Sequence, residues 1–360
     1  MKPYKIILSG GGTGGHLFPA LAIAEEIKLR YPTSEILFVG ALGRIEMTKV
    51  PAAGFKIIGL WIDGFQRSLS IKNLLFPIKL LFSLAESLFI TLAFRPNIVV
   101  GTGGYASGPL LFIANALKYP TLIQEQNSYP GITNRLLASR VKKIAVAYAD
   151  LESFFPESKL VLTGNPIRKK IQQELPESGK AKAHFNLDSN RKTLVVLGGS
   201  LGARRINQLI ASKLDFFKAK KIQVVWQCGA LYYEEYKVLE TADVLVKAFV
   251  ADMEQLYSAS DFVISRSGAA TLSELCCVGK PALLIPSPNV AENHQMQNAM
   301  ALVNQNAALV VAENKLDEEF ETIFQSLLET SVQESLSVNI RKLAKPEATK
   351  HIVDLIEEII

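Results

Sequence analysis

Lys5-Ile-Ile-Leu-Ser-Gly-Gly-Gly-Thr-Gly-Gly15 is a run of apolar residues that leads directly into a cluster of glycines. Thr193-Leu-Val-Val-Leu-Gly-Gly-Ser-Leu-Gly202 repeats this arrangement about 190 residues later. Each stretch predicts a buried strand, a tight turn and the start of a helix, which is how a Rossmann-type α/β domain opens. The two openings therefore predict two Rossmann-like domains, and we expect them to face each other across a cleft.

The pattern between and after these stretches favours an α/β fold with parallel sheets. Short β-branched runs alternate with segments of helix length, as in βαβ units. A length of 360 residues suits two domains. Gly164-Asn-Pro-Ile-Arg168 interrupts regular structure and sets the expected boundary between a domain at 1–163 and one at 164–340. We expect strands at 5–9, 36–40, 56–60, 97–101, 121–124, 143–147, 193–198, 223–227, 244–248, 262–265, 282–285 and 308–311, and helices at 17–30, 203–217, 269–278 and 292–304.

Composition and charge limit the class of protein. Hydrophobic residues make up 49% of the chain and charged residues 20%, which fits a globular protein and excludes disorder, collagen and a disulfide scaffold. Three cysteines without a spaced framework fit a reducing cytosol. The net charge of +5 is uneven, because residues 1–159 carry +7 and residues 160–360 carry −2. This asymmetry predicts an anionic partner for the first half.

Residues 74–94 contain 15 apolar residues out of 21, close to the length of a membrane span. Pro77, Lys79 and Glu86 argue against spanning, since a charge at the bilayer centre costs about 2.5–3.5 kcal/mol. Polar residues recur on one helical face, which predicts one or two amphipathic helices. Packing on the protein core and in-plane contact with lipid both remain open.

Glycine-rich and polar segments follow several of the predicted strands. Gly10, Gly12 and Gly15 satisfy the dinucleotide pattern GxGxxG, but no acid follows the second strand before Glu46, so NAD is disfavoured. Such glycines also admit a phosphate or a sugar at a helix N-terminus. The remaining segments are a glycine cluster at 101–109, polar residues at 124–131, a strand-to-helix junction at 266–274 and a polar helix start at 286–295, where we favour Gln295 over His294 as a ligand contact.

GGGTGGH, GGYASGP, QEQNSYPG, GNPIR, GGSLGA, SRSGAATLSE and AENHQMQNA follow one another over residues 5–304 in the order typical of the MurG family. The chain resembles these N-acetylglucosaminyltransferases of peptidoglycan synthesis. The resemblance implies a GT-B fold in which a C-terminal helix, at 341–360 here, returns to the first domain. It also implies a peripheral enzyme on the cytoplasmic face of the inner membrane, acting in cell-wall biogenesis, cell shape and cell division.

The resemblance further implies an inverting transfer of GlcNAc from UDP-GlcNAc to the 4-OH of MurNAc in undecaprenyl-pyrophosphoryl-MurNAc-pentapeptide (lipid I), which yields lipid II and UDP. It assigns contacts with the donor to Thr13, Gly14, Gly15, Asn127, Arg168, Ser200, Val250, Ala269, Ala270, Thr271, Leu272, Ser273, Glu274 and Gln295. It assigns contacts with the acceptor to Gly103, Gly104, Tyr105, Ser107 and Asn134. Expected partners are these two substrates, an anionic membrane surface and a cell-wall synthesis complex, and not nucleic acid.

The chemistry of the implied reaction needs a base for the acceptor hydroxyl and stabilisation of the diphosphate. His16 is the favoured base because it adjoins a glycine-rich turn, although a positioning role stays open, and Glu125 is second. No Asp-x-Asp occurs in the chain, so we expect neither a metal nor another cofactor. Two alternatives remain, a UDP-GlcNAc 2-epimerase-like isomerase and a non-enzymatic sensor of a UDP-sugar or lipid pyrophosphate.

Overall fold

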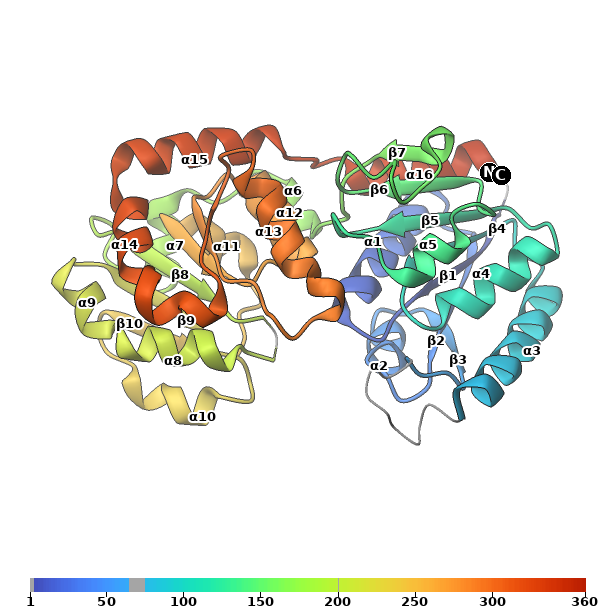
Figure 1. Cartoon of the computed structure of the whole chain (residues 1–360), viewed down its shortest axis with the longest axis horizontal. Coiled ribbons are helices and arrows are strands. Elements are labelled where there is room, and N and C mark those ends of the chain that lie inside the picture. The colour runs from blue at the N-terminus through green and yellow to red at the C-terminus, as the bar shows by residue number, and fades with distance from the viewer. Residues whose placement is uncertain (1–2, 65–74, 200) are drawn as a thin grey trace. The chain divides into compact units, whose positions relative to one another are not determined.

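The computed structural model describes residues 3–64, 75–199 and 201–360. The chain divides into two compact units, of which unit 1 comprises Met1–Ile167 together with Pro346–Ile360, and unit 2 comprises Arg168–Lys345 (Figure 1). These boundaries lie within a few residues of those expected from the sequence.

Unit 1 is built on a seven-stranded sheet in the order β3-β2-β1-β4-β5-β6-β7, in which all pairs in the described residues are parallel. Apolar residues of β1 and β4 lie in the centre and are fully buried, as expected when helices cover both faces. The strands are β1 (Lys5–Gly10), β2 (Glu35–Ala41), β3 (Lys56–Leu60), β4 (Ile98–Gly103), β5 (Thr121–Glu125), β6 (Lys143–Val146) and β7 (Leu160–Leu162). The helices are α1 (Gly14–Arg30), α2 (Glu46–Ala52), α3 (Phe76–Phe94), α4 (Ser107–Ala116), α5 (Ile132–Leu137), η2 (Glu157–Lys159) and α16 (Ala348–Ile359).

Unit 2 repeats the design with a six-stranded sheet in the order β10-β9-β8-β11-β12-β13, also parallel among the described pairs. Its strands are β8 (Thr193–Leu197), β9 (Gln223–Gln227), β10 (Val244–Lys247), β11 (Phe262–Ser265), β12 (Ala282–Leu284) and β13 (Leu309–Val310). Its helices are α6 (Lys169–Gln172), α7 (Ser178–His184), α8 (Arg204–Ser212), α9 (Leu214–Ala219), α10 (Tyr233–Tyr236), η3 (Lys237–Leu239), α11 (Met253–Ala259), α12 (Ala269–Val278), η4 (Ala291–Asn293), α13 (His294–Val303), η5 (Glu313–Lys315), α14 (Leu316–Leu328) and α15 (Thr330–Lys342).

The predicted fold class of two parallel-sheet, Rossmann-like units is confirmed, and it matches the GT-B architecture. Each predicted strand is present, with ends that coincide or differ by at most two residues, and the short strand β7 was not predicted. The predicted helix at 203–217 is two helices, α8 and α9, separated at Lys213. Helix α1 begins at Gly14, three residues before its expected start, because the glycine turn itself is the first helical turn.

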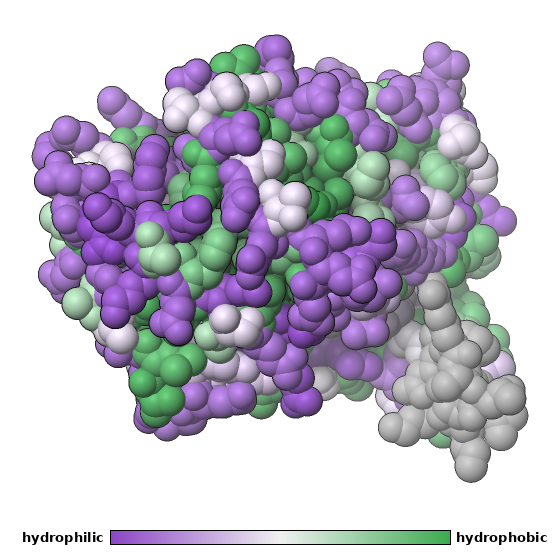
Figure 2. Space-filling model, turned by 60° about the vertical axis from the view of Figure 1, so that its left-hand side comes forward, coloured by the Kyte–Doolittle hydropathy of each residue, from purple (hydrophilic) through white to green (hydrophobic). Residues whose placement is uncertain are grey.

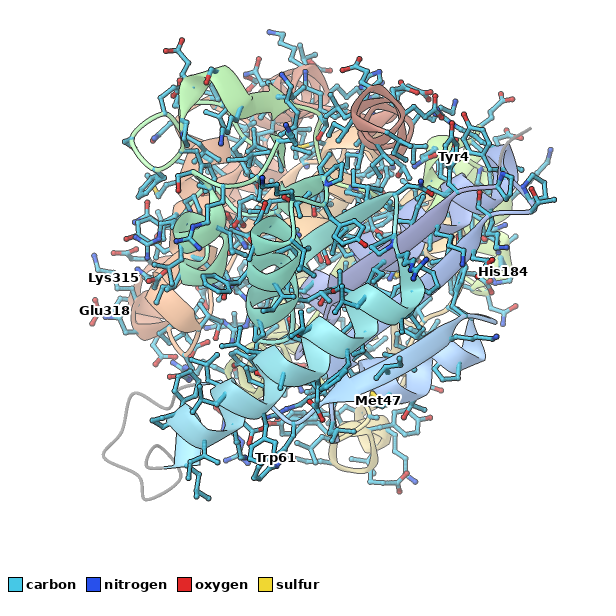
Figure 3. The ribbon with its side chains drawn as sticks, turned by 90° about the vertical axis from the view of Figure 1, so that its right-hand side faces the viewer. Tyr4, Met47, Trp61, His184, Lys315 and Glu318 are labelled. Carbon is cyan, nitrogen blue, oxygen red and sulfur yellow. The ribbon has the colours of Figure 1, made fainter. Side chains whose placement is uncertain are left out.

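Helix α3 carries its polar residues toward the protein. Ser83, Ser87 and Thr91 are buried, whereas Leu81, Phe82 and Phe89 are 67%, 55% and 72% exposed. The segment is one helix, packed on α4, and it lies at the surface of unit 1 in Figure 3, where Trp61 is labelled beside it. By length and composition α3 is the one helix in the described residues that could cross a membrane, and 17% of its apolar window is buried.

This outward apolar row contrasts with the surface in Figure 2, where hydrophilic residues cover much of the visible face and apolar residues lie in groups between them. At α3, Trp61 packs edge-on against Phe82, with ring centroids 5.7 Å apart. Lys79 lies over the Trp61 ring and pairs with Asp63, and Glu86 accepts the backbone N–H of Trp61 at 3.2 Å. The polar face of this helix that the sequence predicts therefore contacts the protein.

Candidate active site

The two glycine-rich turns of unit 1 meet where its strand order reverses, between β1 and β4. This switch point is where α/β sheets bind ligands, because adjacent loops diverge there. Gly103 and Gly104 have φ of 98° and 92°, and a Cβ on Gly104 would lie 2.3 Å from the carbonyl oxygen of Gly11. The close approach of these turns thus depends on glycine. Tyr105 is exposed beside them, while the buried Ser107 hydroxyl donates to the carbonyl of Gly104 at 2.8 Å.

The side chain of Glu46 supports the first glycine turn through hydrogen bonds. Its carboxylate is fully buried and accepts the backbone N–H groups of Gly12 and Ala41, each at 2.9 Å. Glu46, the first acidic residue after the second strand, therefore shapes the glycine turn. Because a buried carboxylate needs hydrogen bonds to be tolerated, this pair of donors fixes both β2 and the turn.

His16 lies in the first turn of α1, and the contacts of its ring favour one neutral tautomer. Its Nδ1 lies 3.0 Å from the carbonyl oxygen of Thr102 and 3.0 Å from Oε1 of Gln126. The Gln126 amide is oriented by its Nε2, which donates to the Thr102 carbonyl at 2.7 Å. Both partners of Nδ1 are acceptors, so Nδ1 carries the hydrogen and Nε2 holds a lone pair.

Glu125 has a different environment. It is 1% exposed, and its carboxylate accepts the backbone N–H groups of Asn127 and Gly131 at 3.0 and 3.1 Å. The side-chain amides of Asn127 and Asn134 donate to it at 3.2 and 2.8 Å. A carboxylate that receives four donors organises the 127–134 turn, and this geometry argues against Glu125 as the base. Asn134 is itself buried and directed at Glu125, which argues against direct contact with an acceptor.

In unit 2 the switch point lies between β8 and β11, and α12 starts directly after β11. Gly268 precedes the helix in extended conformation, so the first backbone N–H groups of α12 have no partner within the helix and suit an anion. Ala269, Ala270 and Thr271 form this turn and are half-buried. Leu272 is fully buried and its N–H bonds the Gly268 carbonyl at 3.0 Å, so the structure makes it a core residue and not a ligand contact.

Glu274 lies one turn further along α12 and is 4% exposed. Nη1 of Arg168 donates to both of its oxygens, at 2.8 and 2.9 Å, and the hydroxyl of Tyr257 donates to Oε2 at 3.0 Å. Burial raises the pKa of Glu274, and the positive charge of Arg168 opposes this shift. Arg168, which the resemblance places near the donor diphosphate, is in this structure the counter-ion of Glu274.

Two glutamines order the neighbouring loops. The Gln227 amide accepts the N–H of Val250 at 2.9 Å and donates to the carbonyl of Gly199 at 3.2 Å. Oε1 of Gln295 accepts the N–H of Ser287 at 2.8 Å, and the Gln295 carbonyl accepts from the Ser267 hydroxyl at 2.8 Å. Val250 and Gln295 are thus fixed at the same end of the sheet as α12. Ser200 lies outside the described residues.

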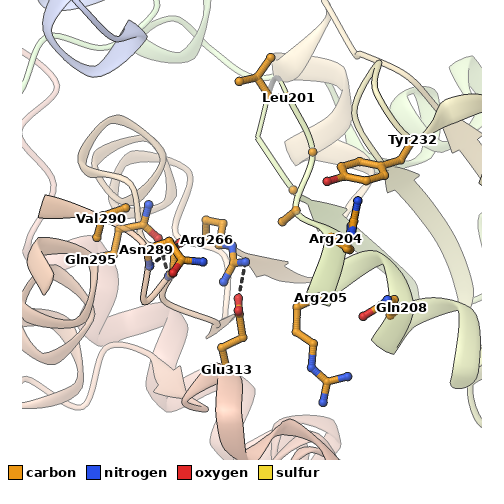
Figure 4. A pocket seen from close by; sticks show the side chains of 14 residues that line it. Leu201, Arg204, Arg205, Gln208, Tyr232, Arg266, Asn289, Val290, Gln295 and Glu313 are labelled. Atoms are coloured by element: carbon orange, nitrogen blue, oxygen red, sulfur yellow. Dashed lines mark hydrogen bonds and ion pairs between the residues drawn. The ribbon is translucent and has the colours of Figure 1, made fainter. Parts of the chain in front are cut away.

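A cavity of about 660 Å³ opens at this end of unit 2. Leu201, Arg204 and Tyr232 line one side, and Arg266 and Gln295 line the other (Figure 4). Arg266 is paired with Glu313, as the dashed line shows, and Arg204 lies over the Tyr232 ring. The excess of guanidinium groups suits an anionic ligand group. Among residues 3–64, 75–199 and 201–360 no three His, Cys, Asp or Glu side chains gather as a metal site requires.

Comparison with known proteins assigns the family. Residues 6–146 match the glycosyltransferase family 28 N-terminal domain, and residues 193–359 match the glycosyltransferase family 28 C-terminal domain. A Flavobacterium psychrophilum protein named UDP-N-acetylglucosamine--N-acetylmuramyl-(pentapeptide) pyrophosphoryl-undecaprenol N-acetylglucosamine transferase is 53% identical over 100% of this chain and 99% of its own length. The chain belongs to the MurG branch of glycosyltransferase family 28.

Other MurG relatives and structures agree with this assignment. A protein of the same name from Christiangramia forsetii is 53% identical over 99% of this chain and 98% of that protein. The crystal structure of Acinetobacter baumannii MurG has a TM-score of 0.80 and 26% identity, covering 99% of this chain and 100% of that one. A UDP-N-acetylglucosamine 2-epimerase has a TM-score of 0.64 with 14% identity over 99% of this chain and 95% of its own, a likeness of fold alone.

Sequence reasoning on this MurG chain missed three supporting residues: Glu46, Tyr257 and Gln227. Each is a polar side chain that is buried, and each acts on a predicted site residue or turn through a hydrogen bond. A lone tyrosine or glutamine within an apolar run carries no local sign of its partner. Only the polar character of Gln227 at the end of a strand could have suggested its position.

Proposed function

We propose that this chain is an inverting glycosyltransferase that moves GlcNAc from UDP-GlcNAc to the 4-OH of MurNAc in undecaprenyl-pyrophosphoryl-MurNAc-pentapeptide, and releases UDP. The observation that carries the proposal is the 53% identity with transferases of that name over the whole chain. The epimerase alternative has support only from a distant likeness of fold.

Unit 1 supplies the base in this proposal. The Nε2 lone pair of His16 accepts the proton of the MurNAc 4-OH as that oxygen attacks the anomeric carbon of the donor. The resulting imidazolium is stabilised because Nδ1–H already points at two oxygen acceptors, Thr102 O and Gln126 Oε1. The glycine turn with Gly103, Gly104 and Tyr105 receives the acceptor, whose diphosphate suits exposed backbone N–H groups.

Unit 2 holds the donor in this proposal. The N-terminal turn of α12 binds the diphosphate, Glu274 accepts hydrogen bonds from the ribose hydroxyls, and Gln295 contacts the sugar. Uracil lies at Val250. As the bond to the sugar breaks, negative charge grows on the leaving diphosphate, and preorganised N–H donors stabilise such charge by about 2.7–4 kcal/mol each. Arg168, released from Glu274 when the ribose binds, adds its positive charge to this stabilisation, and no metal is required.

Unit 1 also binds the membrane in this proposal, peripherally and on the cytoplasmic face. The outward row of Leu81, Phe82 and Phe89 enters the acyl boundary, and the +7 charge of residues 1–159 favours an anionic leaflet. A lipid-linked acceptor is delivered from the same surface.

The test is transfer of labelled GlcNAc to a short-chain analogue of the lipid acceptor. Wild type should release UDP only with acceptor, and should do so in EDTA; formation of UDP-ManNAc would instead indicate the epimerase. His16→Ala should lower kcat by about 10²–10⁴-fold, the usual contribution of a positioned base. His351→Ala, on the exposed face of α16, is the matched control and should retain full activity. A His16→Ala enzyme within about threefold of wild type would exclude this base.

A further inference from the structure

A hydrogen bond from the protein core reaches the carboxylate that we assign to the donor ribose. Tyr257, on α11, is fully buried, and its hydroxyl donates to Oε2 of Glu274 at 3.0 Å. Burial raises the pKa of the Tyr257 phenol well above its usual range, so the hydroxyl keeps its proton and stays a donor. Nothing in the proposed reaction uses this residue.

The other partner of Glu274 is less constrained. The Arg168 side chain is 50% exposed, and its Nη1 bridges both carboxylate oxygens. A long, half-exposed side chain is free to change rotamer when a ligand arrives, whereas a tyrosine ring packed in the core is not. Of the two donors, Tyr257 is therefore the one that can set the plane of the carboxylate before the nucleotide binds.

We propose that Tyr257 is a positioning residue for nucleotide recognition, which fixes the Glu274 carboxylate so that it accepts hydrogen bonds from the two ribose hydroxyls of the donor. This inference rests on the proposed function. The hydroxyl of Tyr257 occupies one lone pair of Oε2, and the positions that Arg168 holds on both oxygens become available to the ribose when that half-exposed side chain changes rotamer. A carboxylate without this anchor would rotate or stay on Arg168, and the ribose would lose well-aligned acceptors.

The test compares Tyr257→Phe with Tyr236→Phe, a matched loss of one hydroxyl from another buried tyrosine of unit 2, which packs on Trp226. Tyr257→Phe should raise KM for UDP-GlcNAc about tenfold, as when one hydrogen bond to a charged group is lost, with kcat within about twofold. Tyr236→Phe should change neither. With the 2′-deoxyribose analogue of UDP-GlcNAc, the ratio of KM between Tyr257→Phe and wild type should shrink toward one.

A purely structural role would raise KM for both donors by the same factor, and that result, or an unchanged KM, overturns the inference. If Tyr257→Phe does not fold, the test is made by comparing Glu274→Gln with Glu274→Gln/Tyr257→Phe, both of which lack the buried charge. Their affinities for UDP, measured by calorimetry, should then be equal; a further loss in the double variant contradicts the inference. A wild type that binds UDP but transfers no GlcNAc would refute the proposed function, and Tyr257→Phe and Tyr236→Phe would then be compared by their affinities for UDP.

Discussion

Helices α3 and α16 both cover unit 1, yet they turn opposite faces toward it. Helix α16 buries Ile352, Val353 and Ile356 against α1, as amphipathic helices in water do. Helix α3 instead buries serine and threonine against α4 and presents leucine and phenylalanine outward. The difference shows that α16 is held by the core it completes, whereas α3 leaves an apolar face exposed, which is typical of an interaction surface.

The largest effect should come from making the exposed apolar face of α3 polar. In Leu81→Gln/Phe82→Gln/Phe89→Gln, sedimentation with anionic vesicles should fall at least about 100-fold in partition coefficient, because each large apolar side chain contributes about 1.5–3 kcal/mol when buried. Thermal stability should change little, since Leu81 and Phe89 are 67% and 72% exposed and Phe82 packs on one neighbouring ring, that of the exposed Trp61. Ser87→Ala, on the inner face, is the control and should bind vesicles as wild type does. Equal binding by the triple variant would refute a membrane role for α3.

An intermediate effect should follow from truncating the inner face of α16. Ile356→Ala and Ile352→Ala should each lower the free energy of unfolding by about 2–5 kcal/mol, because both side chains are buried in the core of unit 1. Urea unfolding measures the change, with the exposed Glu358→Ala as the control. Vesicle binding by the folded variants should persist. A loss below about 0.5 kcal/mol would show that α16 does not complete this core.

The smallest effect should come from the charges that fasten α16 to α1. Arg30 donates to Glu26 and Glu357 at 3.0 and 2.9 Å and also pairs with Asp354. Arg30→Met keeps the apolar stem and should cost about 1 kcal/mol, since part of this cluster is exposed to solvent. The cost should shrink at high salt, which unfolding in 1 M NaCl would reveal. A cost that does not depend on salt would mean that Arg30 acts through packing.

The same contrast shows what could be predicted from the sequence. Strands such as β1 and β8 were found because a buried run before glycines has one structural solution in an α/β protein. The helical period of α3 was also visible, but its orientation was not, since periodicity reveals two faces without telling which one faces the protein. The contacts of Glu46 with Gly12 and of Tyr257 with Glu274 could not be predicted, because they span 34 and 17 residues and only the fold brings these groups together.

The carboxylate of Glu46 has a consequence for how this chain can evolve. A Cβ on Gly11 would lie 2.2 Å from Oε1 of Glu46, and one on Gly40 would lie 2.5 Å from its Cγ. Glu46 cannot swing away without abandoning the N–H groups of Gly12 and Ala41. A side chain at Gly11 or Gly40 is therefore disfavoured while Glu46 is present, and loss of Glu46 would leave the Gly12 and Ala41 N–H groups without their acceptor, so the trio of Gly11, Gly40 and Glu46 is expected to change together or not at all. Mutational libraries should find the trio accessible only through paired substitutions, which makes it an epistatic barrier between this turn and the dinucleotide-binding turns that it resembles.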